Sequence, residues 1–158
     1  MEAISICIGR KGSKGLPGKN TMKVRGKPLA FYSMNAAFKS KYVKHKFLST
    51  DDKLIEEIGC KLDHYLVERP KELADSKALG EDVFKYTYEK IINERNELRG
   101  MPVVLLFCNA ATISSELIDD AIELLMEEEE TDSVVTVSKF NMWSPLRARK
   151  MDNENKYL

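Results

Sequence analysis

Apolar residues in this chain form short unbroken runs, which alternate with longer stretches where they recur every three or four positions. A short apolar run is typical of a buried strand, and the wider spacing is typical of an amphipathic helix. The runs predict strands at residues 3–8, 46–50, 64–67, 102–108 and 133–138. The stretches between them predict helices at residues 28–38, 52–58, 81–98 and from 115 into the glutamate run at 127–130. Gly59 is expected to end the second helix and Ser115 to cap the fourth.

Strands that alternate with helices and are apolar along their length are typical of a mostly parallel sheet with helices on both faces. We therefore expect an α/β fold with three layers. Such folds bind ligands outside the carboxyl ends of their strands. The 158 residues fit a single domain spanning 1–158. Residues 139–158 continue neither pattern, so we expect this domain to be incomplete at its C-terminus.

Composition narrows the class of protein. The chain is 43% hydrophobic and 32% charged, which favours a folded core over disorder. No apolar run approaches the roughly 20 residues that span a bilayer, and no secretory signal is evident, so a cytoplasmic protein is expected. Cys7, Cys60 and Cys108 lie too far apart to suggest a disulfide framework or a zinc site. We expect all three to be buried as small apolar residues in a reducing compartment.

The 25 basic and 25 acidic side chains are unevenly distributed. Residues 1–50 hold eleven Lys or Arg and one acidic residue, Glu2. Such a basic segment is compatible with nucleic acid, an anionic surface or a phosphate-bearing small molecule. Stacking aromatics are not interleaved with these charges, so nucleic acid is not expected as a partner. A solvated surface is expected for Lys39, Lys41, Lys44 and Lys46.

The basic residues between positions 9 and 20 form a different kind of cluster. The segment reads Gly-Arg-Lys-Gly-Ser-Lys-Gly-Leu-Pro-Gly-Lys-Asn and directly follows the first predicted strand. Glycines allow tight turns and expose backbone N–H groups, and the cations add charge-assisted hydrogen bonds, a combination that suits polyanion binding. The glycine spacing fits neither the P-loop nor the dinucleotide fingerprint. The alternative is an ordinary glycine-rich turn with surface lysines.

Three motifs in this order resemble those of a known family. They are R-x-x-S-K-G-L-P-x-K-N at 10–20, S-T-D at 49–51 and R-P-x-E-L-A at 69–74. They resemble the acylneuraminate cytidylyltransferases, also called CMP-sialic acid synthetases, and the resemblance covers essentially the whole chain. It implies a fold of the nucleotide-diphospho-sugar transferase type. It also implies a reaction of CTP with a nine-carbon 2-keto sugar acid, giving the CMP-sugar and pyrophosphate, with Mg²⁺ balancing the triphosphate.

The resemblance assigns roles to individual positions. Arg10 and Lys19 would hold the triphosphate and act as catalytic residues, with Lys19 nearest the α-phosphate. The residues implied to contact the nucleotide are Gly12, Ser13, Lys14, Gly15, Asn20, Arg69 and Gly80, with Arg69 on the cytosine edge. Asn109 and Arg147 are implied to contact the sugar acid. The magnesium ligands of the family fall in a segment that this chain lacks, so no metal ligand is assigned, and a homodimer is compatible with the resemblance.

Two positions depart from the family pattern. Phe107 stands where relatives have a glutamine that contacts the sugar, although Asn109 supplies an amide two residues later. Gly80 stands where relatives have a hydroxyl residue near the base. A pocket built around a hydrogen bond usually rejects a partner that lacks it, so a modified nonulosonate or another sugar acid is an alternative substrate.

Other functions stay open at this point. One alternative is a nucleotidyltransferase of the same fold that uses another nucleotide or sugar, and another is a nucleotide-binding module without catalysis. Asp51 and Asp52 are adjacent carboxylates. They are expected to serve as the N-cap and as an acidic residue in the first turn of a helix, in preference to binding a metal. The membrane is not expected as a partner.

Overall fold

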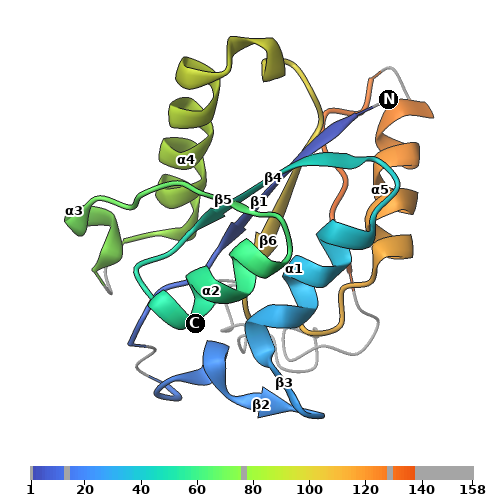
Figure 1. The fold of residues 1–158 in the computed structure, drawn as a ribbon. Coiled ribbons are helices and arrows are strands. Elements are labelled where there is room, and N and C mark those ends of the chain that lie inside the picture. The colour runs from blue at the N-terminus through green and yellow to red at the C-terminus, as the bar shows by residue number, and fades with distance from the viewer. Residues whose placement is uncertain (1, 13–14, 76–77, 128–129, 138–158) are drawn as a thin grey trace, which may run out of the picture.

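Strands and helices alternate along the chain (Figure 1), and the computed structural model describes residues 2–12, 15–75, 78–127 and 130–137. The strands are β1 (Ala3–Ile8), β2 (Lys23–Val24), β3 (Lys27–Pro28), β4 (Val43–Ser49), β5 (Tyr65–Leu66) and β6 (Val103–Phe107). The helices are α1 (Leu29–Lys39), α2 (Lys53–Lys61), α3 (Lys71–Ala74), α4 (Gly80–Glu94) and α5 (Ser115–Glu127), with 3₁₀ turns η1 (Lys19–Thr21) and η2 (Asn96–Leu98). None of the described helices is both long and apolar enough to cross a membrane.

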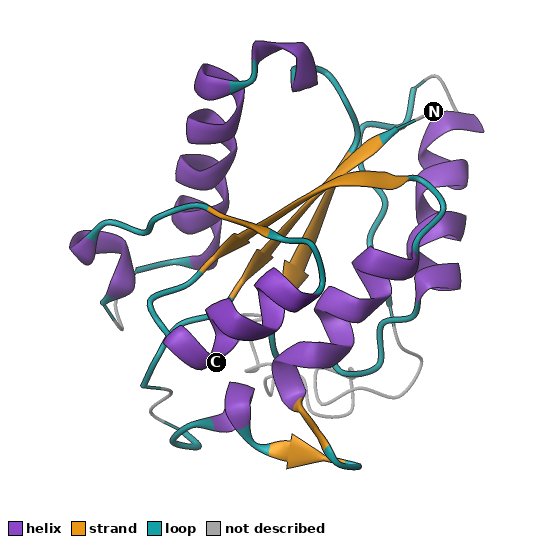
Figure 2. Ribbon diagram, in the orientation of Figure 1, coloured by secondary structure: helices purple, strands orange, loops and turns teal. Residues whose placement is uncertain are grey.

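The central sheet has the strand order β5-β4-β1-β6, and each neighbouring pair is parallel. Ile8, the last residue of β1, pairs in register with Ser49 of β4 and with Phe107 of β6. The three strands therefore end at one edge of the sheet, where the loops that follow them meet (Figure 2). This edge is where the parallel topology predicts a ligand site.

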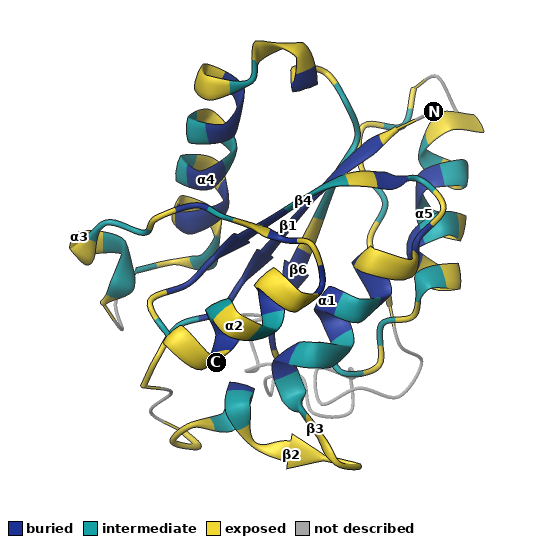
Figure 3. Cartoon of the chain, in the orientation of Figure 1, coloured by how far each residue is buried: buried dark blue, intermediate teal, exposed yellow. Residues whose placement is uncertain are grey.

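Helices cover both faces of the sheet, so the predicted three layers are confirmed. Helices α1, α2 and α5 lie on one face and α4 on the other (Figure 1). Alternate residues of β1 face the two layers: Cys7 packs with the first group of helices, whereas Ile6 packs with α4. Buried positions follow the strands and the inner faces of the helices (Figure 3). Burial of both faces explains why the strand sequences are apolar without alternation.

The second helix does not end at Gly59, as its sequence predicts, but continues to Lys61. A Cβ at Gly59 would lie 2.5 Å from Cδ2 of Leu48 in β4. The glycine therefore permits α2 to approach the sheet closely, and the prediction that it stops the helix is wrong. Asp52 caps the N-terminus of this helix, as predicted, by accepting a hydrogen bond from the Leu54 N–H at 3.0 Å.

The predicted strand at 133–138 is wrong for its described residues, since 133–137 form no strand. The side chains of Val135 and Val137 are 77% and 88% exposed. High β-propensity reflects a fit to a half-buried pleated surface, and these residues pack on none. Helix α5 begins at Ser115 as expected, but the hydroxyl that caps it belongs to Ser114, which accepts from the Leu117 N–H at 3.2 Å.

One short hairpin was not predicted. Strands β2 and β3 pair antiparallel around Arg25 and Gly26, whose φ angles are 49° and 83°. Two consecutive residues with positive φ are typical of a tight hairpin turn, which usually contains Asn-Gly or Asp-Gly. Arg25 stands where Asn or Asp is usual in such a turn, so the sequence does not predict the hairpin.

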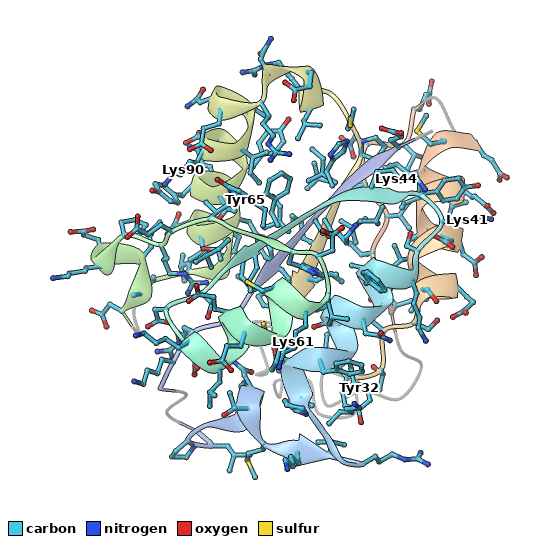
Figure 4. All side chains as sticks on the ribbon, in the orientation of Figure 1. Tyr32, Lys41, Lys44, Lys61, Tyr65 and Lys90 are labelled. Carbon is cyan, nitrogen blue, oxygen red and sulfur yellow. The ribbon has the colours of Figure 1, made fainter. Side chains whose placement is uncertain are left out.

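The basic residues of β4 and its preceding loop are not all on a solvated surface. Lys41 and Lys44 lie at the start of the strand and are exposed, as predicted (Figure 4). Lys46 instead has a side chain only 9% exposed, and its Nζ lies 3.2 Å from Oδ2 of Asp63. The prediction for Lys46 is therefore corrected to a partly buried ion pair.

Candidate functional site

A cavity of about 510 Å³ lies at the carboxyl edge of the sheet. It is bounded by the loop after β1, the segment after β5, the N-terminus of α4 and the end of β6. Its polar lining comes from Arg10, Lys19, Asn20, Arg69, Asp75 and Asn109. Its apolar lining comes from Ile8, Leu16, Leu73, Ala78, Val83 and Phe107, and Gly9, Gly15 and Gly80 complete it. The cavity thus joins a cationic side to an apolar side.

The structure brings most of the predicted site residues together. Those that line the cavity are Arg10, Gly15, Lys19, Asn20, Arg69, Gly80 and Asn109. Gly12 lies in the same loop but does not line the cavity. Ser13, Lys14 and Arg147 lie outside the described residues.

The loop after β1 (residues 9–18) leaves the sheet at a position that only glycine fits. The Gly9 N–H donates to the carbonyl of Ser49 at 3.2 Å. A Cβ at Gly9 would lie 2.5 Å from Sγ of Cys108 and 3.3 Å from Cδ1 of Ile55. At its other end the loop turns at Gly18, whose φ of 67° leads into the short helix that begins with Lys19. Glycine adopts this left-handed conformation without strain.

Replacement of Gly9 by alanine is therefore expected to lower the free energy of unfolding by about 1–3 kcal/mol, because the methyl group overpacks the site beside Cys108. Urea denaturation measures this change. Gly15→Ala is the matched control, since no described atom lies within 4 Å of a Cβ there. Equal stability of the two variants would contradict the close packing at Gly9.

Asn20 is buried behind the loop with one polar atom unpaired. Its Nδ2 donates to the carbonyl of Arg10 at 3.4 Å, and the residue is 7% exposed. Its Oδ1 is buried and has no hydrogen-bond partner among the described residues. A buried acceptor without a partner is unfavourable, so this oxygen suits a hydroxyl or amino donor of a ligand in the cavity.

Arg69 is fixed against the end of β4. Its Nη2 donates to the carbonyl of Ser49 at 2.6 Å, and its Nε donates to the Ser49 hydroxyl at 3.3 Å. Burial lowers the pKa of Arg69, nearby Arg10 lowers it further, and the carboxylate of Asp51 opposes both effects. Among the described residues, only Ser49 accepts hydrogen bonds from this guanidinium, and its other N–H groups form a planar donor edge that suits a ligand.

The two positions that depart from the family pattern lie in contact with each other. A Cβ at Gly80 would lie 3.2 Å from Cε1 and 3.4 Å from Cζ of Phe107. The Phe107 ring also packs edge-to-face on Phe84 of α4, with centroids 5.3 Å apart. Phe107 is 48% exposed at the cavity. Gly80 therefore makes room for an aromatic wall, which no local sequence signal indicates.

Two of the three cysteines are core residues, as predicted. Cys7 and Cys108 are buried with their Sγ atoms 3.6 Å apart. Contact with the Cys7 thiol and burial together raise the pKa of Cys108, so the thiol form is favoured. Cys60 is exposed, so its predicted burial is wrong: it lies on the outer side of α2.

The carboxylates of Asp51 and Asp52 accept hydrogen bonds from backbone N–H groups. Asp52 caps α2, and Oδ1 of Asp51 accepts from the Lys11 N–H at 2.7 Å. The described residues contain no group of three or more His, Cys, Asp or Glu that suits a metal ion.

Comparison with known sequences identifies relatives. Residues 4–153 match the model of a family described as cytidylyltransferase. The chain is 30% identical over 158 residues to a Helicobacter pylori protein named pseudaminic acid cytidylyltransferase and UDP-2,4-diacetamido-2,4,6-trideoxy-beta-L-altropyranose hydrolase. That alignment covers 97% of this chain and 29% of the Helicobacter protein. It is 39% identical over 87 residues to an N-acylneuraminate cytidylyltransferase of Streptococcus agalactiae, covering 54% of this chain and 21% of that protein.

Solved structures share the fold. The structure of a CMP:2-keto-3-deoxy-manno-octonic acid synthetase complexed with CTP matches with a TM-score of 0.62 at 17% identity, over 82% of this chain and 49% of that one. A cytidylyltransferase from Leptospira borgpetersenii matches with a TM-score of 0.58 at 19% identity, over 82% of this chain and 51% of that one. These matches confirm the predicted fold type, and the chain spans about half of each structure.

The family match extends over nearly the whole chain and includes the three motifs that first suggested it. The loop after β1 and Arg69, which carry two of these motifs, meet in one cavity at the carboxyl edge of the sheet. Sequence and structure agree that the chain belongs to the cytidylyltransferase family.

Proposed function

We propose that this protein is a cytidylyltransferase that activates a sialic-acid-like 2-keto sugar acid with CTP, releasing pyrophosphate. The observation that carries the proposal is the cavity in which the cationic loop after β1 meets the guanidinium of Arg69. Relatives named for pseudaminic acid and for N-acylneuraminate support the class of sugar. The reaction is assigned to the cytoplasm, where CTP is made.

The chemistry is an in-line displacement at phosphorus. The anomeric hydroxyl of the sugar acid attacks the α-phosphorus of CTP and loses its proton, a new oxygen–phosphorus bond forms, and the bond to the departing pyrophosphate breaks. Arg10 and Lys19 would hold the triphosphate and offset the charge that develops on it, with Gly12, Ser13, Lys14 and Gly15 supplying further contacts. Positioning and charge stabilisation account for most catalysis in reactions of this type.

The nucleoside would lie between Asn20 and Arg69. The unpaired Oδ1 of Asn20 suits a ribose hydroxyl, and the free N–H groups of Arg69 suit the carbonyl edge of cytosine. Gly80, at the start of α4, lines the same cavity, and the Phe107 ring packs against it. The arrangement of these residues around one cavity supports the assignment.

The sugar acid would extend toward Asn109, and Arg147 would contribute a cation to the same end. Phe107 presents an aromatic ring where a hydroxylated sugar would need a hydrogen-bond partner. The Phe107 ring favours a modified nonulosonate that places an acyl or methyl group against it. Magnesium is expected to arrive bound to the triphosphate, and no step is assigned to a metal held by the described residues. A homodimer is compatible with the proposal.

The experiment is thermal denaturation of the chain with CTP, UTP, GTP or ATP, each with magnesium. A ligand at 100 times its dissociation constant adds about 2.7 kcal/mol to the free energy of unfolding. Stabilisation by CTP alone is expected, followed by pyrophosphate release when a sugar acid is added. A shift with UTP, GTP or ATP instead would indicate another nucleotidyltransferase. No shift with any of the four would contradict nucleotide binding and favour another role for the loop.

A further inference from the structure

Two adjacent carboxylates at the end of β4 have different partners. Asp52 accepts a hydrogen bond from the Leu54 N–H and caps α2. Asp51 lies one residue closer to the strand, is exposed, and accepts from the Lys11 N–H at 2.7 Å. One carboxylate therefore stabilises a helix, and the other binds the backbone of the loop after β1.

Few contacts hold the described part of this loop in place. The Gly9 N–H is fixed at the sheet by Ser49, and the carbonyl of Arg10 accepts a long bond of 3.4 Å from Asn20. Beyond Arg10, the Lys11 N–H donates to Oδ1 of Asp51 at 2.7 Å, which links the described outgoing part of the loop to the end of β4. Gly12 follows with a φ of 72°, a left-handed conformation that glycine adopts without strain.

Asp51 also acts on the other side of the cavity. The negative charge of Asp51 raises the pKa of Arg69 and so favours its protonated guanidinium. That guanidinium donates a hydrogen bond to the carbonyl of Ser49, which precedes Asp51 by two residues. Residues 49–51 thus hold both the loop and Arg69, while Asp51 itself does not line the cavity. The negative charge of Asp51 would by itself oppose the binding of an anionic ligand in the cavity.

We propose that Asp51 is a positioning residue: through the Lys11 N–H it holds the loop in the conformation that, under the proposed function, binds the triphosphate of CTP. The Lys11 side chain has no part in this, because the bond uses the backbone. The hydrogen bond and the negative charge of Asp51 have opposite effects on nucleotide binding. Two substitutions separate them, since asparagine keeps the acceptor oxygen without the charge and alanine removes both.

The test is calorimetric titration of the full chain with CTP and magnesium. Asp51→Ala is expected to bind CTP about 5- to 10-fold more weakly than Asp51→Asn, because both variants lack the charge and only asparagine keeps an acceptor for the Lys11 N–H. Asp51→Asn is expected to bind as tightly as the unmodified protein or more tightly. Asp52→Ala is the matched control: it should lower the melting temperature through loss of the helix cap, with the dissociation constant for CTP unchanged.

Two results would overturn the proposal: equal affinity of the alanine and asparagine variants for CTP, or an equal loss of affinity in Asp52→Ala. A second measurement requires no nucleotide. Exchange of the Lys11 amide proton, followed by NMR, should be slow in the unmodified protein and in Asp51→Asn but fast in Asp51→Ala. If CTP does not bind the unmodified protein, the proposed function fails, and the Lys11 amide still decides whether Asp51 holds the loop.

Discussion

Under the proposed function, replacement of Lys19 by alanine is expected to slow formation of the CMP-sugar by about 10²–10³-fold, which is typical for the loss of one preorganised donor at a developing charge. Lys19 begins the short helix η1, lines the cavity and is half-buried. Gly18 sets its direction by adopting a left-handed conformation. The backbone of Lys19 is therefore placed at the cavity before charge builds up on the triphosphate. Steady-state release of pyrophosphate from CTP and a sugar acid measures the rate.

Lys11→Ala is the control for this effect. The Lys11 side chain is exposed and does not line the cavity, and the backbone N–H that binds Asp51 survives the substitution. Its rate should stay within a few-fold of the unmodified enzyme. A similar loss in both variants would mean that general positive charge, and not the position of Lys19, supports the reaction.

Acidification from pH 6.5 to 4 is expected to remove about 3 kcal/mol of stability through His64 alone. The pKa of His64 is lowered to about 4, mainly by burial and further by nearby Lys46. The hydrogen bond between Nδ1 and the Leu62 carbonyl, at 2.9 Å, opposes this shift. Nε2 is buried without a partner among the described residues. Below pH 6.5 the unfolded chain binds a proton that the folded protein excludes, so unfolding becomes more favourable as the pH falls.

Urea denaturation at pH 7 and pH 4.5 tests this prediction. His64→Asn keeps a donor near the Leu62 carbonyl but does not titrate, so it should lose much less stability between the two pH values. His45→Asn removes the other histidine, which is more exposed, and should behave like the unmodified protein. Identical pH dependence in all three proteins would show that His64 contributes nothing to acid sensitivity.

Local sequence carries most of the information about the fold. A continuous apolar run predicts β1 because both faces of this strand are buried. An apolar run also predicts β6, although Leu105 and Phe107 of that strand are 52% and 48% exposed. The same reasoning fails at residues 133–137, where a strand-like composition meets no partner surface in the described structure. The same reasoning wrongly predicts that Gly59 ends a helix. A glycine that ends a helix and a glycine that lets a helix pack closely on a sheet cannot be distinguished from the local sequence.

The candidate site is predictable to the extent that it consists of loops after parallel strands. Arg10 and Arg69 follow different strands, and the topology alone brings them to one edge. The contact between Gly80 and Phe107 is not predictable in this way, since it depends on how α4 packs over the sheet. The role of Asp51 is hidden for the same reason, because its partner is a backbone N–H far away in sequence.

The pairing of β1 with both β4 and β6 has a consequence for how the protein acquires its ligand site. The segments that meet at Ile8 come from the beginning, the first third and the last third of the chain. Contacts between such distant segments form slowly, because a large loop must close before they are made. Until β6 docks, Phe107 and Asn109 are absent from the cavity, so a chain still emerging from the ribosome has no complete pocket. Recovery of nucleotide binding would therefore report the docking of β6 during refolding.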